Sequence, residues 1–283
     1  MTIDASYSHC QFLARRQAKN FYYSFLLLDA DRRRAMCAIY AFMRLCDDLS
    51  DADGIADRPA AMKELRRQLE DAFQGRTPAD PLWPAFIDTV ARYRIPHEYF
   101  FDMIDGVSSD LDPRRIRAFA ELYDYCYHVA SVVGLTIIHI FGFDSPEAPP
   151  EALALAEKCG IAFQLTNILR DVREDAENHR VYLPEEDLER FHVTAADLRA
   201  THPSEELKKL LAFEATRARE YYRESGPLVE MIHQDSRASL RALIGIYSRL
   251  LDCIVDSGYD VLARRIRVPT WEKVWILARS RWG

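Results

Sequence analysis

Polar side chains fall on one side of the helix predicted by QLTNILRDVREDAENHRVYLP, residues 164–184. Asn167, Asp171 and Asp175 are spaced by four residues, and Gln164 lies one turn before Asn167. Residues three and four apart share a helix face, so these groups project together. The preceding stretch ALALAEKCGIAF is apolar enough to be buried. Carboxylates that reach into such a core need cations, because otherwise they take up protons or destabilise the fold. The apolar packing is expected from Ile168, Leu169 and Val172.

A second acidic cluster lies in RLCDDLSD, residues 44–51. Asp47 and Asp51 share a helix face, Asp48 flanks them, and Tyr40 and Arg44 continue that side upstream. Carboxylates this close repel one another, and Mg²⁺, which prefers carboxylate and water oxygens, would remove the repulsion. The alternative is a solvated helix end, because a loop is expected directly after this segment.

Two such helices that face each other would form a cage for divalent cations. The natural ligand of the cage is a diphosphate, because Mg²⁺ is usually bound by a few carboxylates together with substrate phosphates. Arginine grips phosphate oxygens, and the candidates are Arg44, Arg170, Arg180 and Arg265. For each arginine taken alone, the alternative is a solvent-facing ion pair. No packing role is evident for Asp48 or Asp171, so asparagine at either position should reduce turnover by orders of magnitude and leave the fold intact.

The composition is that of an ordinary globular protein. The chain has 283 residues, of which 49% are hydrophobic and 29% are charged, so it can bury a sizeable core. A net charge of -7 without a basic block argues against a nucleic-acid partner. Six scattered cysteines form no C-x-x-C pair, which favours reduced thiols in a cytoplasmic protein.

Several common catalytic motifs are missing from the sequence. It contains no G-x-G-x-x-G after a strand and no P-loop, which argues against dinucleotide folds and P-loop enzymes. There is no H-E-x-x-H, no histidine cluster at zinc-ligand spacing and no serine hydrolase elbow.

Helical periodicity dominates the chain, and no run of alternating strands is evident. The pattern predicts a single all-α domain over residues 1–283. Its helices are expected over 7–52, 60–75, 81–94, 96–110, 116–142, 150–178, 205–225 and 235–257.

The possible membrane segments are few. The first 20 residues have no apolar signal core, and the longest apolar run, 129–143, is too short to span a bilayer and predicts a buried core helix. The C-terminal ARRIRVPTWEKVWILARSRW combines basic and tryptophan side chains. We expect a solvated helix that docks through Trp271 and Trp275; the alternative is peripheral contact with an anionic membrane.

With these motifs in place, the chain resembles the squalene/phytoene synthase family of head-to-head prenyl transferases. The resemblance covers nearly the whole length and implies the family's all-α isoprenoid synthase bundle with a central prenyl-binding cavity. It rests on NFYYSFLLLDADRRRAMCAIYAFMRLCDDLSD (20–51), YCYHVASVVG (125–134), GIAFQLTNILRDVREDAENHRVYLP (160–184) and IYSRLLDCIVDSGYDV (246–261).

The resemblance assigns roles position by position. The family's first aspartate-rich motif matches Asp47, Asp48 and Asp51. The second matches Asp171 and Asp175, with Gln164 and Asn167 in front, so that Mg²⁺ would be held by these aspartates and Asn167. Positions that line the diphosphate or carbocation site in relatives match Tyr40, Arg44, Tyr127, Arg170, Tyr247 and Arg265. Aromatic positions along the prenyl channel match Phe21 and Phe25.

The chain departs from its relatives in three places. Relatives often have serines near the diphosphate where this chain has Ala18 and Asn20, which puts the phosphate contacts in doubt. They often have a bulky aromatic residue where this chain has Cys37, and this puts the preferred prenyl chain length in doubt.

The resemblance also implies a reaction. The allylic C–O bond of one prenyl diphosphate ionises, the double bond of a second prenyl chain attacks the cation, and loss of a proton closes a cyclopropane. Tyr40, Tyr127 and Tyr247 are candidates to stabilise cations or to assist proton removal, although core packing is the alternative for Tyr127.

The pattern in YCYHVASVVGLTIIHIFG is most similar to bacterial presqualene diphosphate synthases of hopanoid pathways. The expected substrates are therefore two farnesyl diphosphates, with phytoene synthesis from geranylgeranyl diphosphate as the alternative. NADPH is expected only if the reaction continues to squalene. A terpene cyclase is a more distant reading, because NILRDVRED does not fit the usual second motif of cyclases. A non-catalytic assembly factor of the same fold is also more distant, because both aspartate sets are intact. The sequence does not indicate an oligomeric state.

Overall fold

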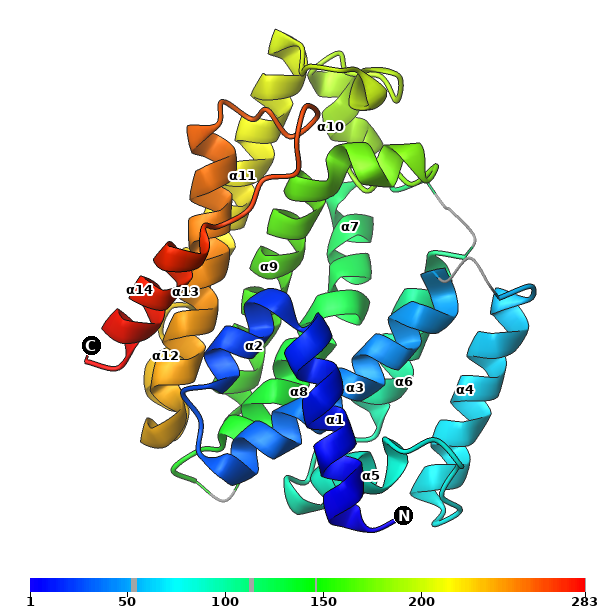
Figure 1. Cartoon of the computed structure of the whole chain (residues 1–283). Coiled ribbons are helices and arrows are strands. Elements are labelled where there is room, and N and C mark those ends of the chain that lie inside the picture. Colours follow the sequence, from blue (N-terminus) through cyan, green and yellow to red (C-terminus); the bar gives the residue numbers. More distant parts are fainter. Residues whose placement is uncertain (52–54, 112–114, 146, 283) are drawn as a thin grey trace.

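The computed structural model confirms the all-α expectation (Figure 1). It describes residues 1–51, 55–111, 115–145 and 147–282, without the side chains of Lys19, Asn20 and Asp51. In these ranges there is no strand. The helices are α1 (Ile3–Gln17), α2 (Lys19–Phe25), α3 (Ala30–Asp51), α4 (Arg58–Phe73), α5 (Trp83–Arg92), α6 (Glu98–Ser109), α7 (Phe119–Cys126), the π-helical turn η1 (Tyr127–Ser131), α8 (Val132–Phe141), α9 (Pro150–Glu177), α10 (Glu185–Arg190), the 3₁₀ turn η2 (Asp197–Arg199), α11 (Glu205–Ser225), α12 (Leu228–Met231), α13 (Gln234–Asp256) and α14 (Thr270–Ser280).

Helix α9 is the central element of the bundle, with α8, α11 and α13 packed around it (Figure 1). The expected apolar side of its C-terminal half is confirmed, because Ile168, Leu169 and Val172 are buried. They belong to a hydrophobic cluster that also contains residues of α11 and α13. Burial of this side fixes the rotation of α9, so the face that carries Gln164 and Asn167 is directed away from α11.

The single helix predicted over 7–52 is wrong, since the segment forms α1, α2 and α3. Between α2 and α3 the backbone tightens through three successive i to i−3 bonds, the first from the Leu26 N–H to the Tyr23 carbonyl. Asp29 then caps α3, because its Oδ1 accepts the Arg32 N–H at 2.9 Å. The apolar periodicity continues through the leucines of this turn, which is why the pattern did not indicate a break.

The helix predicted over 116–142 forms, but it begins at Phe119 and contains the π turn η1. This turn packs closely against α6 and α9 at two glycines. A Cβ on Gly160 would lie 2.5 Å from Ser131 Cα, and a Cβ on Gly106 would lie 2.8 Å from the His128 carbonyl carbon. Side chains at either position would collide with backbone atoms, so both glycines are required for this packing. The π turn also shifts which residues of the helix face inward.

Among the described residues, one helix, Phe119–Phe141, has the length and the apolar composition that a membrane span needs. It is longer than the apolar run considered in the sequence, because α7 and η1 extend it. However, 61% of its most apolar 18-residue stretch is buried inside the protein. This agrees with the expected buried core helix.

The expected C-terminal helix is α14, but the prediction that it docks through its tryptophans is wrong. Trp271 is 69% exposed and Trp275 is 57% exposed. The docking side carries Ile276, which meets Gly245 of α13, and Glu272, which pairs with Arg249 at 2.5 Å. Because residues 272 and 276 are one turn apart, their contacts direct Trp271 and Trp275 outward.

Helix α10, which the sequence pattern did not indicate, is fixed to α11 by a buried ionic group. Arg217 Nη1 donates to Glu214 at 2.8 Å and to Asp187 at 3.0 Å. Burial raises the pKa of Glu214 to about 7, against the opposing effect of Arg217. The group holds α10 beside the start of α7, where the Phe119 N–H donates to Glu186 at 2.7 Å.

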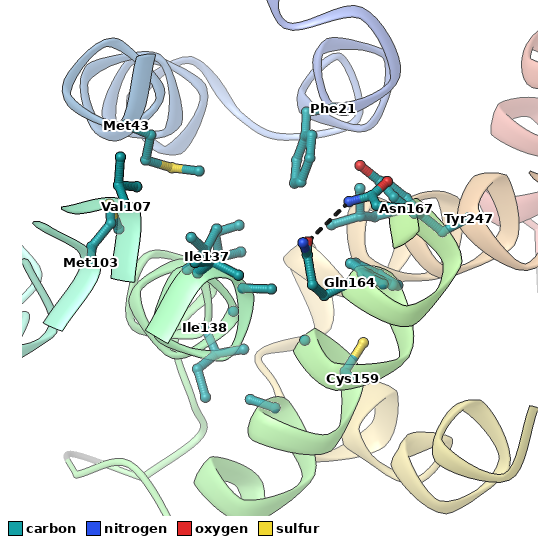
Figure 2. A pocket seen from close by; sticks show the side chains of 18 of the residues that line it. Phe21, Met43, Met103, Val107, Ile137, Ile138, Cys159, Gln164, Asn167 and Tyr247 are labelled. Atoms are coloured by element: carbon teal, nitrogen blue, oxygen red, sulfur yellow. Dashed lines mark hydrogen bonds between the residues drawn. The ribbon is translucent and has the colours of Figure 1, made fainter. Parts of the chain in front are cut away.

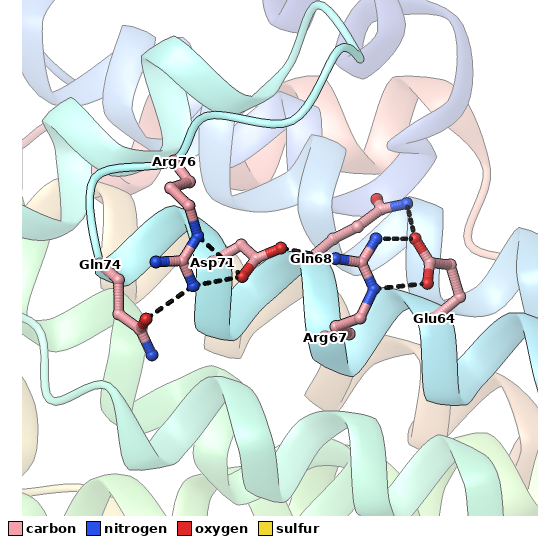
Figure 3. A network of polar contacts seen from close by, with 6 residues as sticks. All are labelled: Glu64, Arg67, Gln68, Asp71, Gln74 and Arg76. Atoms are coloured by element: carbon pink, nitrogen blue, oxygen red, sulfur yellow. Dashed lines mark hydrogen bonds and ion pairs between the residues drawn. The ribbon is translucent and has the colours of Figure 1, made fainter.

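A network of polar contacts lies on the surface of α4 (Figure 3). Arg67 bridges Glu64 and Asp71, and Arg76 returns to Asp71 beyond the end of the helix. Exposed pairs of this kind are screened by solvent and contribute little to stability. Their local role is to close the C-terminal turn of α4.

Candidate active site

A cavity of about 300 Å³ lies inside the bundle, and its walls come from α2, α3, α6–α9, α12 and α13. Most of the lining is apolar, including Met43, Met103, Val107 and Ile137 (Figure 2). Polar groups enter from several sides: Asp47, Ser50, Asp110, Tyr125, Gln164, Asn167 and Tyr247. An apolar chamber bordered by carboxylates and amides suits a ligand with a hydrocarbon body and a polar head.

Five residues proposed from the sequence line this cavity: Phe21, Asp47, Gln164, Asn167 and Tyr247. They come from α2, α3, α9 and α13, so the fold brings together segments far apart in the chain. Figure 2 shows Phe21, Gln164, Asn167 and Tyr247 directed toward one another, and Asn167 Nδ2 donates to Gln164 Oε1 at 3.3 Å. Asp47 and Asn167 therefore bring the two polar helices, α3 and α9, to the same cavity.

On α3, the remaining proposed groups lie beside the cavity. Arg44 and Asp48 form an ion pair one turn apart, and Tyr40 lies near both. Burial raises the pKa of the Tyr40 hydroxyl to about 12. Asp51 ends α3, and its side chain lies outside the described part of the structure. The α3 carboxylates are thus partly neutralised by an arginine of their own helix.

On α9, Asp171 is held by two arginines. Arg170 Nε donates to it at 2.8 Å, and Arg265 Nη2 donates at 3.2 Å while Nη1 binds Glu174 at 2.6 Å. Both Arg170 and Asp171 are largely buried. With Glu174 and Arg265 they border a second hollow, between α9 and residues 261–265. The sequence analysis required a cation for the Asp171 carboxylate, and here Arg170 and Arg265 supply the positive charge. Asp171 and Asp48 thus each pair with an arginine, a role that the sequence analysis did not indicate for them.

Asp175, one turn further along, has no such neutralising pair among the described residues. Burial raises its pKa to about 7, the neighbouring Asp171 and Glu174 add to this, and Arg180 opposes it. Asp110 acts on Asp175 in the same direction as the other carboxylates. A bound cation would reverse this effect, because it would favour the charged carboxylate.

Two buried polar atoms at the site have no partner in the described structure: Asn167 Oδ1 and Arg44 Nε. Buried polar atoms are almost always satisfied, so these two fit a ligand that supplies a cation to one and an anion to the other. Among the described residues, no three acidic, histidine or cysteine side chains converge closely enough to hold a metal ion alone. Magnesium bound jointly by protein and phosphate oxygens fits such a donor set.

Aromatic rings form a wall beside Asn167. Tyr247 stacks on Phe163 with ring centroids 4.4 Å apart and meets the edge of Phe21 at 5.6 Å. Ring faces attract cations, so this wall can stabilise positive charge in the cavity. Phe163 was missed in the sequence analysis, although it lies four residues before Asn167 and hence on the same helix face.

The structure places Tyr125, rather than Tyr127, at the cavity. Tyr125 lines it and donates to Asp110 at 3.1 Å, and Tyr182 donates to the same carboxylate at 2.9 Å. Tyr127 lies in the π turn, does not line the cavity and is near Asp102 of α6. Positions 125, 129, 133 and 137 all line the cavity and are spaced by four, whereas an α-helix repeats every 3.6 residues. The π turn between them accounts for the difference.

The other residues proposed from the sequence also lie outside the cavity lining. Besides Phe25, Cys37 and Arg180, these are Tyr40, Arg44, Asp48, Arg170, Asp171, Asp175 and Arg265. Phe25 and Cys37 are buried in the core. Arg180 borders a small neighbouring hollow together with Asp110, Tyr125 and Tyr182. Cys37 therefore does not contact this cavity directly, as its proposed place in a channel wall would require.

Comparisons with known proteins agree with this geometry. Residues 14–272 match the family described as squalene/phytoene synthase. A 15-cis-phytoene synthase of Synechococcus elongatus is 36% identical over 282 residues, covering 96% of this chain and 91% of that protein. The crystal structure of a dehydrosqualene synthase with a ligand superposes with a TM-score of 0.91 at 32% identity, covering 99% of this chain and 96% of that one. Squalene synthase HpnC from Alicyclobacillus acidocaldarius superposes with a TM-score of 0.83 at 27% identity, covering 91% and 96%.

Proposed function

Because this chain belongs to the squalene/phytoene synthase family and has its all-α isoprenoid synthase fold, we propose that it condenses two farnesyl diphosphates head to head to presqualene diphosphate. The family indicates a prenyltransferase acting on prenyl diphosphates. The farnesyl chain length of the substrate and the identity of the product go beyond what the family indicates.

The observation that carries the proposal is an apolar cavity that Asp47 reaches from α3 and that Gln164 and Asn167 reach from α9. A prenyl diphosphate has a hydrocarbon chain and a highly charged head, and this cavity offers a matching environment to each. The apolar walls also exclude water, which would otherwise capture a carbocation.

The residues proposed to hold Mg²⁺ are Asp47, Asp48, Asn167, Asp171 and Asp175, joined by Asp51 from the sequence motif. The unpartnered Asn167 oxygen and the raised pKa of Asp175 support this assignment. When bound, Mg²⁺ would neutralise charge on the departing diphosphate.

The arginines have a second proposed role at the diphosphate. Arg44, Arg170 and Arg265 neutralise carboxylates in this state. Once a diphosphate is present, the same guanidinium groups can donate to its oxygens, which suit their planar geometry. The unpartnered Nε of Arg44 is already available for such a bond. The arginines would thus bind the leaving group after its C–O bond breaks and it takes the electron pair.

The aromatic wall would act on the prenyl chains. Phe21, Phe163 and Tyr247 can stabilise the allylic cation through their ring faces and hold the second chain's double bond beside it. Attack by that double bond forms the new C–C bond, and loss of a proton closes the cyclopropane ring. Tyr125, with its hydroxyl fixed on Asp110 in the cavity wall, is the tyrosine we propose to assist this proton loss.

A second candidate is phytoene synthesis from two geranylgeranyl diphosphates. It is favoured by the phytoene synthase of Synechococcus elongatus, at 36% identity over nearly the whole chain. The dehydrosqualene and squalene synthase structures favour the shorter substrate instead. NADPH would be required only if presqualene diphosphate were reduced to squalene.

The test is a product assay on the purified protein. It is incubated with Mg²⁺ and either farnesyl or geranylgeranyl diphosphate, with and without NADPH, and the products are identified by mass. The proposal predicts presqualene diphosphate from farnesyl diphosphate without NADPH. Phytoene from geranylgeranyl diphosphate alone would support the second candidate. A cyclised product from a single prenyl unit, or no turnover in any mixture, would contradict both.

A further inference from the structure

The outer face of α14 is apolar and exposed. Trp271, Val274 and Trp275 are 69%, 55% and 57% exposed, and Trp282, just beyond the helix, is 84% exposed. Val274 and Trp275 follow Trp271 by three and four residues, so the three side chains share one side of α14. Trp282 follows Trp275 by seven residues. The opposite side carries Ile276 and packs on α13 and α2 (Figure 1). Helix α14 is thus apolar on both sides, and only the inner side is covered.

The C-terminal segment that carries this face is rich in basic residues. Residues 264–282 contain six basic side chains and one acidic one, Glu272, in a chain whose net charge is -7. Glu272 is neutralised by Arg249 at 2.5 Å. In the described structure four of the basic side chains have no carboxylate partner and are exposed: Arg264, Arg267, Arg279 and Arg281. The segment therefore combines exposed apolar and positively charged surface.

From these two features we propose that the outer face of α14 docks onto an anionic lipid bilayer. Tryptophan is preferred where apolar and polar phases meet, because its large ring has one polar N–H. A helix that lies in the membrane plane with tryptophans on one side and arginines around them is typical of interfacial binding. An anionic bilayer also supplies the negative charge that these arginines lack, whereas a second copy would bring the same positive charge to the interface.

The position of α14 gives the docking a consequence for the cavity. Helix α14 packs on α2 and α13, which contribute Phe21, Leu243 and Tyr247 to the cavity lining. A bilayer against the outer face of α14 would therefore be separated from the apolar chamber by α14 itself and by α2 and α13. The inference does not depend on which prenyl diphosphate is used.

The test is vesicle binding by the full chain. Vesicles of phosphatidylcholine alone are compared with vesicles that also contain phosphatidylglycerol, by flotation and by tryptophan fluorescence. Fluorescence reports mainly on this surface, because three of the four tryptophans lie here and Trp83 is buried. We expect binding and a blue shift with the anionic vesicles.

Two variants separate the apolar and charged contributions. Trp271→Ala combined with Trp275→Ala should weaken binding to anionic vesicles about 100-fold, at about tenfold for each buried ring. Arg279→Gln combined with Arg281→Gln should weaken it about 30-fold and leave binding to neutral vesicles unchanged. Phe12→Ala, which removes an exposed aromatic ring from α1, is the matched control and should bind as the unchanged protein does.

Three results would overturn the inference. The first is absence of binding to the anionic vesicles. The second is equal binding by the double tryptophan variant and the unchanged protein. The third is a concentration-dependent dimer, measured by sedimentation without lipid, that the tryptophan substitutions abolish, because a second copy would then cover the face. Circular dichroism checks that the variants remain folded, which is expected because the substituted side chains are exposed.

Discussion

Asp171→Asn should destabilise the metal-free protein more than Asp48→Asn, although both change one carboxylate to an amide. The side chains of Asp171 and Arg170 are 15% and 17% exposed, whereas those of Asp48 and Arg44 are 47% and 40% exposed. Removing one partner of a buried pair leaves a charge without compensation and costs about 3–5 kcal/mol, while exposed pairs contribute about 0–1 kcal/mol. Because the Arg170–Asp171 pair keeps some solvent contact and Arg265 adds a further positive charge, we expect about 2–3 kcal/mol for Asp171→Asn.

The measurement is urea unfolding followed by circular dichroism, in a chelator so that no divalent cation is present. Arg170→Gln and the double variant complete a thermodynamic cycle with Asp171→Asn. The double variant should be more stable than the sum of the two single effects implies, by about 1–2 kcal/mol, because it leaves no unpaired charge. Asp48→Asn provides the exposed-pair control.

Equal destabilisation by Asp171→Asn and Asp48→Asn would refute this reasoning. Strict additivity of the two substitutions at Asp171 and Arg170 would refute it as well. Either result would mean that Arg170 does not depend on the Asp171 carboxylate as its counter-ion, and the proposed transfer of this arginine to diphosphate would lose its basis.

Three further predictions concern other parts of the fold. Burial raises the pKa of Glu214 to about 7 from an ordinary value near 4.5. Between these values the folded protein keeps a proton on Glu214 that the unfolded chain loses, so the free energy of unfolding falls as pH rises from about 4.5 to about 7. Glu214→Gln should therefore flatten the pH dependence of urea unfolding between about pH 4.5 and pH 7, and an unchanged slope would contradict the shift. Gly160→Ala should destabilise the protein by more than about 2 kcal/mol in the same assay, because its Cβ would lie 2.5 Å from Ser131 Cα; a fully stable variant would show that the π turn moves freely. Tyr125→Phe should reduce product formation about 100-fold and Tyr127→Phe should change it little, and the reverse order would restore the role first given to Tyr127.

The helices and the polar face of α9 could be predicted because both follow from local spacing. Asn167 lies three residues after Gln164 and four residues before Asp171, so the three share one helix face. The apolar Ile168 and Leu169 fix which side of the helix is buried. The meeting of Asp47 with Asn167 was inferred from their chemistry, since two acidic helices need a shared cation. These expectations depend on residue type and helical phase alone, which a sequence displays directly.

What could not be predicted depends on backbone departures and long side chains. The π turn shifts the helical phase after Tyr125, so the choice between Tyr125 and Tyr127 required coordinates. The use of Arg170 as a counter-ion depends on the rotamer of a flexible side chain, which a sequence pattern does not specify. The exposed tryptophans of α14 were misassigned because a buried and an exposed apolar face have the same periodicity. Tertiary contacts of α13 decide between the two.

The central claim is that α3 and α9 together bind a magnesium diphosphate, and calorimetric titration with inorganic pyrophosphate tests it most directly. With Mg²⁺ present, the unchanged protein should bind pyrophosphate about 100-fold more tightly than in a chelator. Asp47→Asn and Asp175→Asn, one on each helix, should each remove most of that gain. Equal affinity with and without Mg²⁺, or a gain that survives both substitutions, would contradict the claim.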